Sequence, residues 1–238
     1  MFIKICGITR RSDATHAAQH GATALGFICW TGSPRYVEPE HVAEITAGLP
    51  SSIMRVGVFV NEPLDSLLEI VDRARLTAVG VFVNEPLDSL LEIVDRARLT
   101  TVQLHGDEPP AYADAIAVPV LRAVCIDQAD LTGWPSDMPL LLDAPSAALR
   151  GGTGQTIDWD QAAGIARGRK VILAGGLTAD NVAEAIAVVR PFGVDVSSGV
   201  EASPGIKDSG RVSVFLARAR HAFEALALAA QPAHGGRG

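Results

Sequence analysis

The chain has 238 residues, of which 48% are hydrophobic and 20% are charged, and its formal net charge is −7. This balance is typical of a globular protein that buries a core without disulfides or metals. The negative charge argues against a nucleic-acid-binding or anionic-membrane-binding surface, and no apolar run approaches the ~20 residues of a membrane-spanning helix.

Short apolar segments alternate with helical stretches along the chain. The expected strands are residues 2–6, 24–28, 54–60, 101–105, 118–123, 140–143, 171–173 and 194–197. Helices are expected near Ser12, Pro39, Asn61, Glu108, Asp158, Thr178 and Asp208, because most of these residue types favour helix N-termini. The alternation predicts a parallel sheet, and eight units favour a closed (β/α)8 TIM barrel over an open doubly wound sheet.

An unbroken repeat interrupts this alternation. Residues 56–77 read VGVFVNEPLDSLLEIVDRARLT and residues 79–100 read the same, with Ala78 between them. Each copy is one βα unit, because a strand-like VGVFV precedes leucines at helical spacing. Asn61 or Asn84 is expected to cap its helix. Such a match indicates a recent or laboratory-made tandem duplication, and two copies are too few for a solenoid.

Counting both copies gives nine strands, although barrels with a side-chain-filled interior typically have eight. We therefore expect a single α/β barrel domain over residues 1–228, with one duplicated βα unit expelled from the barrel. In one arrangement a whole copy lies outside the barrel, at the face where helices lead into strands. In the other, the helix of the first copy and the strand of the second copy form a long loop over the opposite face, where strands lead into helices. A designed function for the repeat is the less favoured alternative. Residues 229–238 are expected to be a disordered tail.

The three cysteines are far apart, and the N-terminus has no basic start followed by an apolar core. These features predict no metal site, no secretion signal and a reducing cytoplasmic location. Cys29 and Cys125 are interpreted as small buried apolar residues. For Cys6, at the end of a strand and before Gly7, a catalytic thiolate and a buried apolar role both remain open.

In barrel enzymes the functional residues lie at the carboxyl ends of the strands and in the loops that follow. Asp143 ends an apolar strand, where burial raises the pKa of a carboxyl as a general acid requires. Arg35 either binds a carboxylate or is a solvated surface residue. Gln103 and His105 share one face of their strand and are candidates for a pocket.

Glycine-rich loops follow three of the later strands. Residues 151–154 (GGTG) are expected to approach a ligand, Gly154 included. Gly175 and Gly176 follow the seventh strand, and Asp195, Ser198 and Gly199 lie at the end of the eighth. Loops at these two strands form the recurrent phosphate site of this fold. The predicted ligand is therefore a small phosphorylated molecule.

Together these motifs resemble the phosphoribosylanthranilate isomerases of tryptophan biosynthesis. The segments that carry the resemblance are KICGIT (4–9), GFI and SPRY (26–36), VQLHG (102–106), LLLD (140–143), GGTG (151–154), LAGGL (173–177) and DVSSGVE with PGIKD (195–208). The resemblance extends from residue 2 to about residue 226. The extra βα unit departs from the family pattern and bears on stability, loop geometry and activity.

The resemblance implies an Amadori rearrangement without a metal or organic cofactor. Asp143 matches the general acid that protonates the ring oxygen, and Cys6 matches the general base, a thiolate of lowered pKa, that takes the proton from C2′. Arg35 would bind the anthranilate carboxylate. Gln103, His105, Gly154 and Asp195 would line the substrate, and backbone amides around Gly175, Gly176, Ser198 and Gly199 would hold the phosphate. The protein is expected to be a monomer or a homodimer.

Two alternatives remain open. Another phosphate-binding barrel, such as indole-glycerol-phosphate synthase or a histidine-pathway isomerase, is less consistent with the strand ends, because the former carries a Lys/Glu-rich set and the latter an aspartate where this chain has Cys6. The second alternative is a folded barrel that its duplication has impaired or inactivated.

Overall fold

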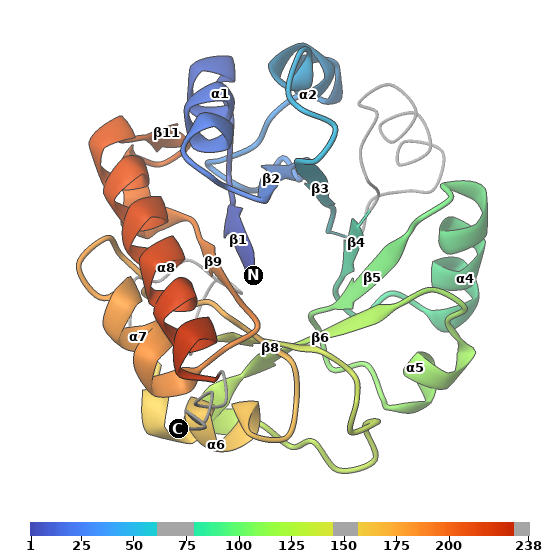
Figure 1. The fold of residues 1–238 in the computed structure, drawn as a ribbon. Helices are drawn as coiled ribbons and strands as arrows, with labels where there is room; N and C mark the ends of the chain where they lie inside the picture. Colours follow the sequence, from blue (N-terminus) through green and yellow to red (C-terminus); the bar gives the residue numbers. More distant parts are fainter. Residues whose placement is uncertain (61–78, 145–156, 231–238) are drawn as a thin grey trace, which may run out of the picture.

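The computed structural model describes residues 1–60, 79–144 and 157–230. Within these residues the main sheet has nine parallel strands, ordered β3-β2-β1-β9-β8-β7-β6-β5-β4. The strands form a ring with the helices outside it (Figure 1). Their bounds are β1 (Phe2–Ile5), β2 (Ala24–Ile28), β3 (Met54–Val58), β4 (Val79–Phe82), β5 (Thr101–Leu104), β6 (Val120–Cys125), β7 (Leu140–Asp143), β8 (Val171–Leu173) and β9 (Gly193–Val196).

The helices follow the strands in the predicted order. They are α1 (Arg11–Gln19), α2 (Pro39–Thr46), α4 (Leu87–Arg96), α5 (Ala111–Ala115), α6 (Trp159–Ala166), α7 (Val182–Val189) and α8 (Ser209–Ala229). A short helix η1 (Ile126–Gln128) follows β6. After β9 come the short helix η2 (Ser198–Val200) and a small hairpin of β10 (Glu201–Ser203) and β11 (Ile206–Lys207). Of the described helices, none combines the length and apolarity needed to cross a membrane.

The predicted caps Asp158 and Asp208 are confirmed, whereas Ser12, Thr178 and Asn84 are wrong. The N-cap positions of α1 and α7 are Arg10 and Asn181. The Asp158 and Asp208 side chains accept hydrogen bonds from the first turns of α6 and α8. Asn84 does not cap α4, which has Pro86 at its N-cap position. Asn84 instead adopts a left-handed backbone, with φ of 58°, and its side chain accepts a hydrogen bond from the Asp107 N–H at 2.6 Å.

Both copies of the repeat place a strand in the sheet, so the prediction that one unit is expelled from the barrel is wrong for the strands. β3 begins two residues before the first copy, ends within it and pairs with β2, and β4 comes from the second copy and pairs with β5. These two strands end the sheet, and they lie side by side with Cα pairs within 8 Å. The sheet is therefore a nearly closed ring of nine strands. Residues 61–78, which include the expected first-copy helix and Asn61, lie outside the described part.

The reason is the apolarity of the repeated strand. The equivalent valines Val56 and Val79 are 4% and 7% exposed, and they share an interior cluster with Ala24 and the half-buried Phe2. The equivalent Phe59 and Phe82 are buried in the core on the other side of the sheet. An expelled copy would expose these side chains and leave its backbone polar groups without a strand partner.

The buried carboxylate of Glu108 connects the second copy of the repeat to the strands that follow it through hydrogen bonds and an ion pair. Glu108, whose side chain is 1% exposed, accepts hydrogen bonds from the backbone N–H groups of Asn84 at 2.7 Å and Gly106 at 2.9 Å. It also forms an ion pair with Arg122 at 2.7 Å, and the Arg122 guanidinium lies over the Trp134 ring. The loop after β4 is therefore joined to β5 and β6.

The end of the chain is described as far as residue 230. Helix α8 reaches Ala229, and the predicted disordered tail lies almost entirely outside the described residues.

Candidate active site

Three strands bring Cys6, Asp143 and Asp195 to one end of the barrel. Cys6 directly follows β1, Asp143 is the last residue of β7, and Asp195 lies in β9. The Cys6 N–H donates to the Val196 carbonyl at 2.8 Å, so the end of β1 is fixed against β9. The alternation of side chains along a strand turns these residues toward the barrel interior.

Lys4 joins this group, although we did not predict it as a site residue. It is opposite Asp195 in the β1–β9 register, and its Nζ donates to Asp195 Oδ2 at 2.6 Å. Both side chains are largely buried, at 8% and 12% exposed. The signal in the sequence was a lysine between Phe2 and Cys6 on the interior face of an apolar strand.

The Cys6 side chain packs against Gly26 of the neighbouring strand β2. A Cβ atom built on Gly26 would be 2.7 Å from Cys6 Sγ and 3.1 Å from Lys4 Cε, so this glycine makes room for both side chains. Burial raises the pKa of the Cys6 thiol, although the positive charges of Lys4 and Lys207 oppose the rise. The resemblance implied a lowered pKa, and for the free protein that expectation is wrong in direction because desolvation outweighs the two cations.

Asp143 has the environment that the sequence predicted. Burial raises the pKa of its carboxyl, and the negative charge of Asp195 adds to the rise, while the Ala144 N–H and Lys4 oppose it. The Ala144 N–H donates to Oδ1 at 2.8 Å. A Cβ atom built on Gly175 would lie 3.0 Å from the same oxygen, so the loop after β8 packs directly against this acid.

Arg35 is not a solvated surface residue, because its guanidinium binds a carboxylate of the protein itself. Its Nε and one terminal nitrogen donate to the two oxygens of Glu201 at 2.9 and 2.8 Å. Lys207 Nζ donates to the same carboxylate at 2.8 Å and to the Ser197 carbonyl at 3.1 Å. One edge of the Arg35 guanidinium is therefore occupied by the protein itself, a contact that the sequence did not reveal.

This ion cluster, defined as Arg35, Glu201 and Lys207, has two cations and one anion. Their side chains are 16%, 4% and 1% exposed. Burial alone would raise the pKa of Glu201, but hydrogen bonds from Arg35 and Lys207 outweigh burial and lower it. Burial lowers the pKa of Lys207, and Glu201 opposes that change. Because two cations face one carboxylate, the cluster has an excess positive charge that favours an anionic ligand.

The loops after β8 and β9 meet at their glycines. Gly175 and Gly176 have φ of 74° and 65°, a region that residues other than glycine rarely adopt. Asn181 fixes this turn by accepting from the Thr178 N–H at 2.7 Å and donating to the Gly176 carbonyl at 2.9 Å. A Cβ atom on Gly199 would collide with the Leu177 carbonyl oxygen. The four predicted phosphate residues, Gly175, Gly176, Ser198 and Gly199, therefore lie on two loops in contact.

The remaining predicted residues divide into two groups. Gln103 is buried in β5, and its amide nitrogen lies 3.1 Å from His105 Nδ1, so the two polar residues form one unit. Gly154 and the rest of the GGTG segment lie outside the described residues.

Two side-chain atoms near the end of β9 are buried without a hydrogen-bond partner among the described residues. They are Asp195 Oδ1 and Ser197 Oγ. Buried polar atoms without a partner are costly and require an explanation.

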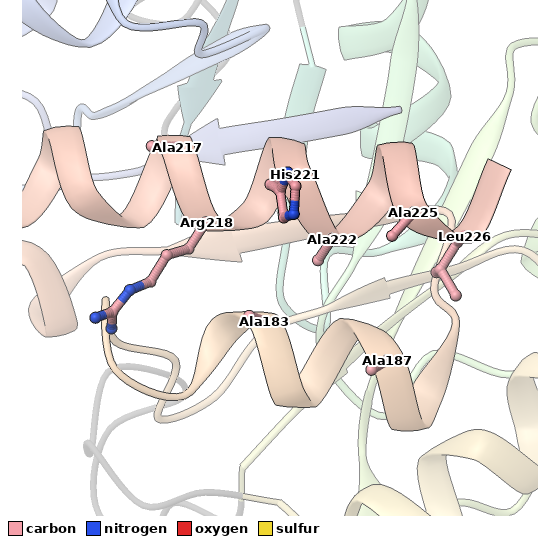
Figure 2. Close-up of a pocket in the computed structure, with 8 residues that line it drawn as sticks. All are labelled: Ala183, Ala187, Ala217, Arg218, His221, Ala222, Ala225 and Leu226. Carbon is pink, nitrogen blue, oxygen red and sulfur yellow. The ribbon is translucent and has the colours of Figure 1, made fainter. Parts of the chain in front are cut away.

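A separate groove of about 540 Å³ lies between α7 and α8 (Figure 2). Its lining consists of Ala183, Ala187, Ala217, Arg218, His221, Ala222, Ala225 and Leu226. Arg218 points away from the other lining residues and binds the Ala179 carbonyl and Asp180. The lining has no thiol or carboxylate.

Comparisons with known proteins agree with this arrangement. The family model described as N-(5'phosphoribosyl)anthranilate (PRA) isomerase matches residues 3–78 and again residues 65–218, so the two matches overlap near the repeat. A Geobacter sulfurreducens protein named N-(5'-phosphoribosyl)anthranilate isomerase is 45% identical over 221 residues, which cover 92% of this chain and 98% of the relative.

Solved structures of the same name have the same fold. The phosphoribosyl anthranilate isomerase of Thermus thermophilus is 35% identical, with a TM-score of 0.69 over 93% of this chain and 99% of its own. Another structure holds reduced 1-(o-carboxyphenylamino)-1-deoxyribulose 5-phosphate. It is 34% identical, with a TM-score of 0.64 over 93% of this chain and 99% of its own.

Proposed function

Because this chain belongs to the N-(5'-phosphoribosyl)anthranilate isomerase family, we propose that it catalyses the Amadori rearrangement of N-(5-phosphoribosyl)anthranilate to 1-(2-carboxyphenylamino)-1-deoxyribulose 5-phosphate in tryptophan biosynthesis. The observation that carries the proposal is the placement of a buried carboxyl and a thiol at one end of the barrel. The pKa of the carboxyl is raised, and loops of the phosphate-binding type adjoin it.

Asp143 is the general acid in this proposal. A carboxyl of raised pKa keeps its proton nearer neutral pH, so it can protonate the furanose ring oxygen and open the ring to a Schiff base. After that step the acid is a carboxylate. The Ala144 N–H already donates to Oδ1 and would stabilise the negative charge.

Cys6 is the general base. In its thiolate form it takes the proton from C2′ and leaves an enolamine, which tautomerises to the ketone. The proton that Asp143 gives and the proton that Cys6 takes balance, so exchange with water returns both groups to their starting forms. The oxidation of C2′ to the ketone is balanced by the reduction of C1′, so the chemistry requires no external oxidant or reductant and no organic cofactor or metal.

The anionic ends of the substrate would be held by two parts of the site. The excess positive charge of the ion cluster supports binding of the anthranilate carboxylate at the Arg35 edge that Glu201 leaves open. The loops around Gly175, Gly176, Ser198 and Gly199 would hold the phosphate through backbone N–H groups. Gln103, His105, Gly154 and Asp195 would line the rest of the substrate.

A folded barrel impaired by its duplication is the second candidate, and the nine-stranded sheet favours it over any unrelated activity. Expression of the full chain in a cell that lacks this enzyme distinguishes the two. Growth without tryptophan is the outcome that the isomerase predicts, whereas a soluble, folded chain that does not restore growth would favour the impaired barrel. The cytoplasmic location and the monomeric or homodimeric state stay predictions.

A further inference from the structure

The buried lysine of β1 has no role in the proposed reaction, although it lies among the reacting groups. Lys4 is 6% exposed. A fully buried ammonium is expensive unless it is paired, and Asp195 supplies the partner at 2.6 Å. The two residues are opposite each other in adjacent strands, so the backbone itself holds the pair in register.

The same lysine is next to the proposed base. Lys4 and Cys6 are two residues apart on one face of the chain, and both lie over Gly26, at 3.1 Å from Cε and 2.7 Å from Sγ to its built Cβ position. A positive charge at this range favours the thiolate over the thiol.

Charged groups act on Cys6 from two other elements. Asp195 of β9 is a carboxyl, and Lys207 of β11 is a second ammonium. Asp143 of β7 acts on Lys4. Lys207 is held by Glu201 in the ion cluster. Asp195, by contrast, uses one oxygen for Lys4, and its Oδ1 has no partner among the described residues.

We propose that Lys4 is a positioning residue for the base: held in place by Asp195, its ammonium stabilises the thiolate of Cys6 and so supplies the form that removes the C2′ proton. The proposal deepens the proposed function and rests on it for the role of the thiolate. Lys4 stays protonated throughout and exchanges no proton with the substrate.

The directions of the pKa changes support this geometry. Burial raises the pKa of Cys6, and Lys4 is the strongest of the influences that oppose the rise. Burial alone would lower the pKa of Lys4, but the charges of Asp195, Cys6 and Asp143 reverse that change and raise it.

The test is a titration of the Cys6 thiol in the full-length protein without substrate. The ultraviolet absorbance of the thiolate, taken as the difference from the Cys6→Ser variant, gives the thiol pKa. Lys4→Gln should raise that pKa by about 1, roughly a tenfold loss of thiolate at neutral pH. Asp195→Asn should lower it, because the variant removes a negative charge that itself raises the thiol pKa and leaves the ammonium facing Cys6 without its counter-ion.

A purely structural role for Lys4 would not produce two shifts of opposite sign. Lys4→Arg should restore most of the thiolate, and Lys170→Gln, which removes an exposed lysine elsewhere, should leave the thiol pKa unchanged. An unchanged or lowered pKa in Lys4→Gln, or a raised one in Asp195→Asn, overturns the proposal. If Lys4→Gln fails to fold, Lys4→Met, which also removes the charge but suits a buried position, is titrated in its place.

The titration is independent of the assignment of the base. In one outcome, Lys4→Gln moves the thiol pKa as expected but leaves the alkaline limb of the kcat/KM profile in place. Lys4 then controls the ionisation of the Cys6 thiol, but Cys6 is not the base. That result would contradict the proposed mechanism and leave the electrostatic pairing intact.

Discussion

At the scale of the residue, the proposed reaction needs Asp143 protonated and Cys6 ionised, and burial raises the pKa of both. The competent form, with Asp143 protonated and Cys6 ionised, has the same net charge as the form with Asp143 ionised and Cys6 protonated. A change in pH therefore does not alter the ratio of these two forms. The kcat/KM profile is therefore expected to be bell-shaped, with one limb from each group. Local charges such as that of Lys4 decide how much of the competent form exists.

Replacement of either Cys6 or Asp143 alone is expected to reduce activity. Cys6→Ser and Asp143→Asn should each lower kcat by at least ~10²-fold, because each removes a proton transfer. Cys125→Ser is the matched control, since Cys125 is opposite Asp143 in the β6–β7 register but has no proposed role. Rates near that of the unmodified protein in either variant would remove that residue from the mechanism.

Asp143 should also cost stability at neutral pH. Its folded-state pKa is raised, so the unfolded chain ionises first as pH rises and the folded state loses stability above the ordinary carboxyl pKa. Asp143→Asn, which can still accept from Ala144, should therefore raise the thermal midpoint near neutral pH. The gain should disappear in acid, where both states carry the proton. A gain of the same size at every pH would contradict this account.

At the scale of the element, the small hairpin after β9 holds the loop after β2. Strands β10 and β11 contribute Glu201 and Lys207, and Arg35 reaches them from the β2 side. Gly7 lies beneath this contact, because a Cβ there would be 2.7 Å from the Arg35 side chain. The hairpin thus positions the guanidinium that we propose as the carboxylate binder.

Glu201→Gln should weaken both folding and substrate binding. Two buried cations would lose their counter-ion, at a cost of roughly 3 kcal/mol in the free energy of unfolding. KM should rise because Arg35 loses its orientation. The control is Glu92→Gln, which breaks an exposed pair with Arg96 and should cost less than about 1 kcal/mol. Denaturant unfolding and steady-state kinetics measure the two effects, and equal costs in both variants would refute the role of the cluster.

The sequence predicted the strands better than the contacts between their ends. Periodicity located every strand of the main sheet, and Asp143 and the two glycine loops could be placed because strand ends share one edge. The Glu201 contact with Arg35 could not be inferred, because it joins residues 166 positions apart. The sequence predicted Asn84 as a helix cap, but its side chain instead accepts a tertiary hydrogen bond from the Asp107 N–H.

At the scale of the whole molecule, both copies of the repeat contribute a strand to the main sheet, and neither strand is expelled from it. Cys6, Asp143 and Asp195 lie in or directly after strands that neither copy supplies, so the additional strand is distant in sequence from the proposed catalytic residues. The consequence is that β3 and β4 both end the sheet, and each has one pairing partner where an interior strand has two.

Removing one copy should close the barrel. Deletion of residues 56–78 or of residues 78–100 gives the same chain, in which a single strand pairs with both β2 and β5. That chain should unfold at a temperature higher by several degrees, because two sheet edges are replaced by backbone pairing. Activity should be equal or higher. A shortened chain that is less stable than the full protein would show that the nine-stranded sheet is the preferred form.

The central claim is that this nine-stranded chain is a working isomerase, and the decay of anthranilate fluorescence tests it most directly. Purified full-length protein is mixed with N-(5-phosphoribosyl)anthranilate, and the fluorescence lost on conversion is followed against time. We predict an enzyme-dependent decay that disappears in Cys6→Ser and Asp143→Asn but persists in Cys125→Ser. A folded protein that leaves the fluorescence at the uncatalysed rate would contradict the claim.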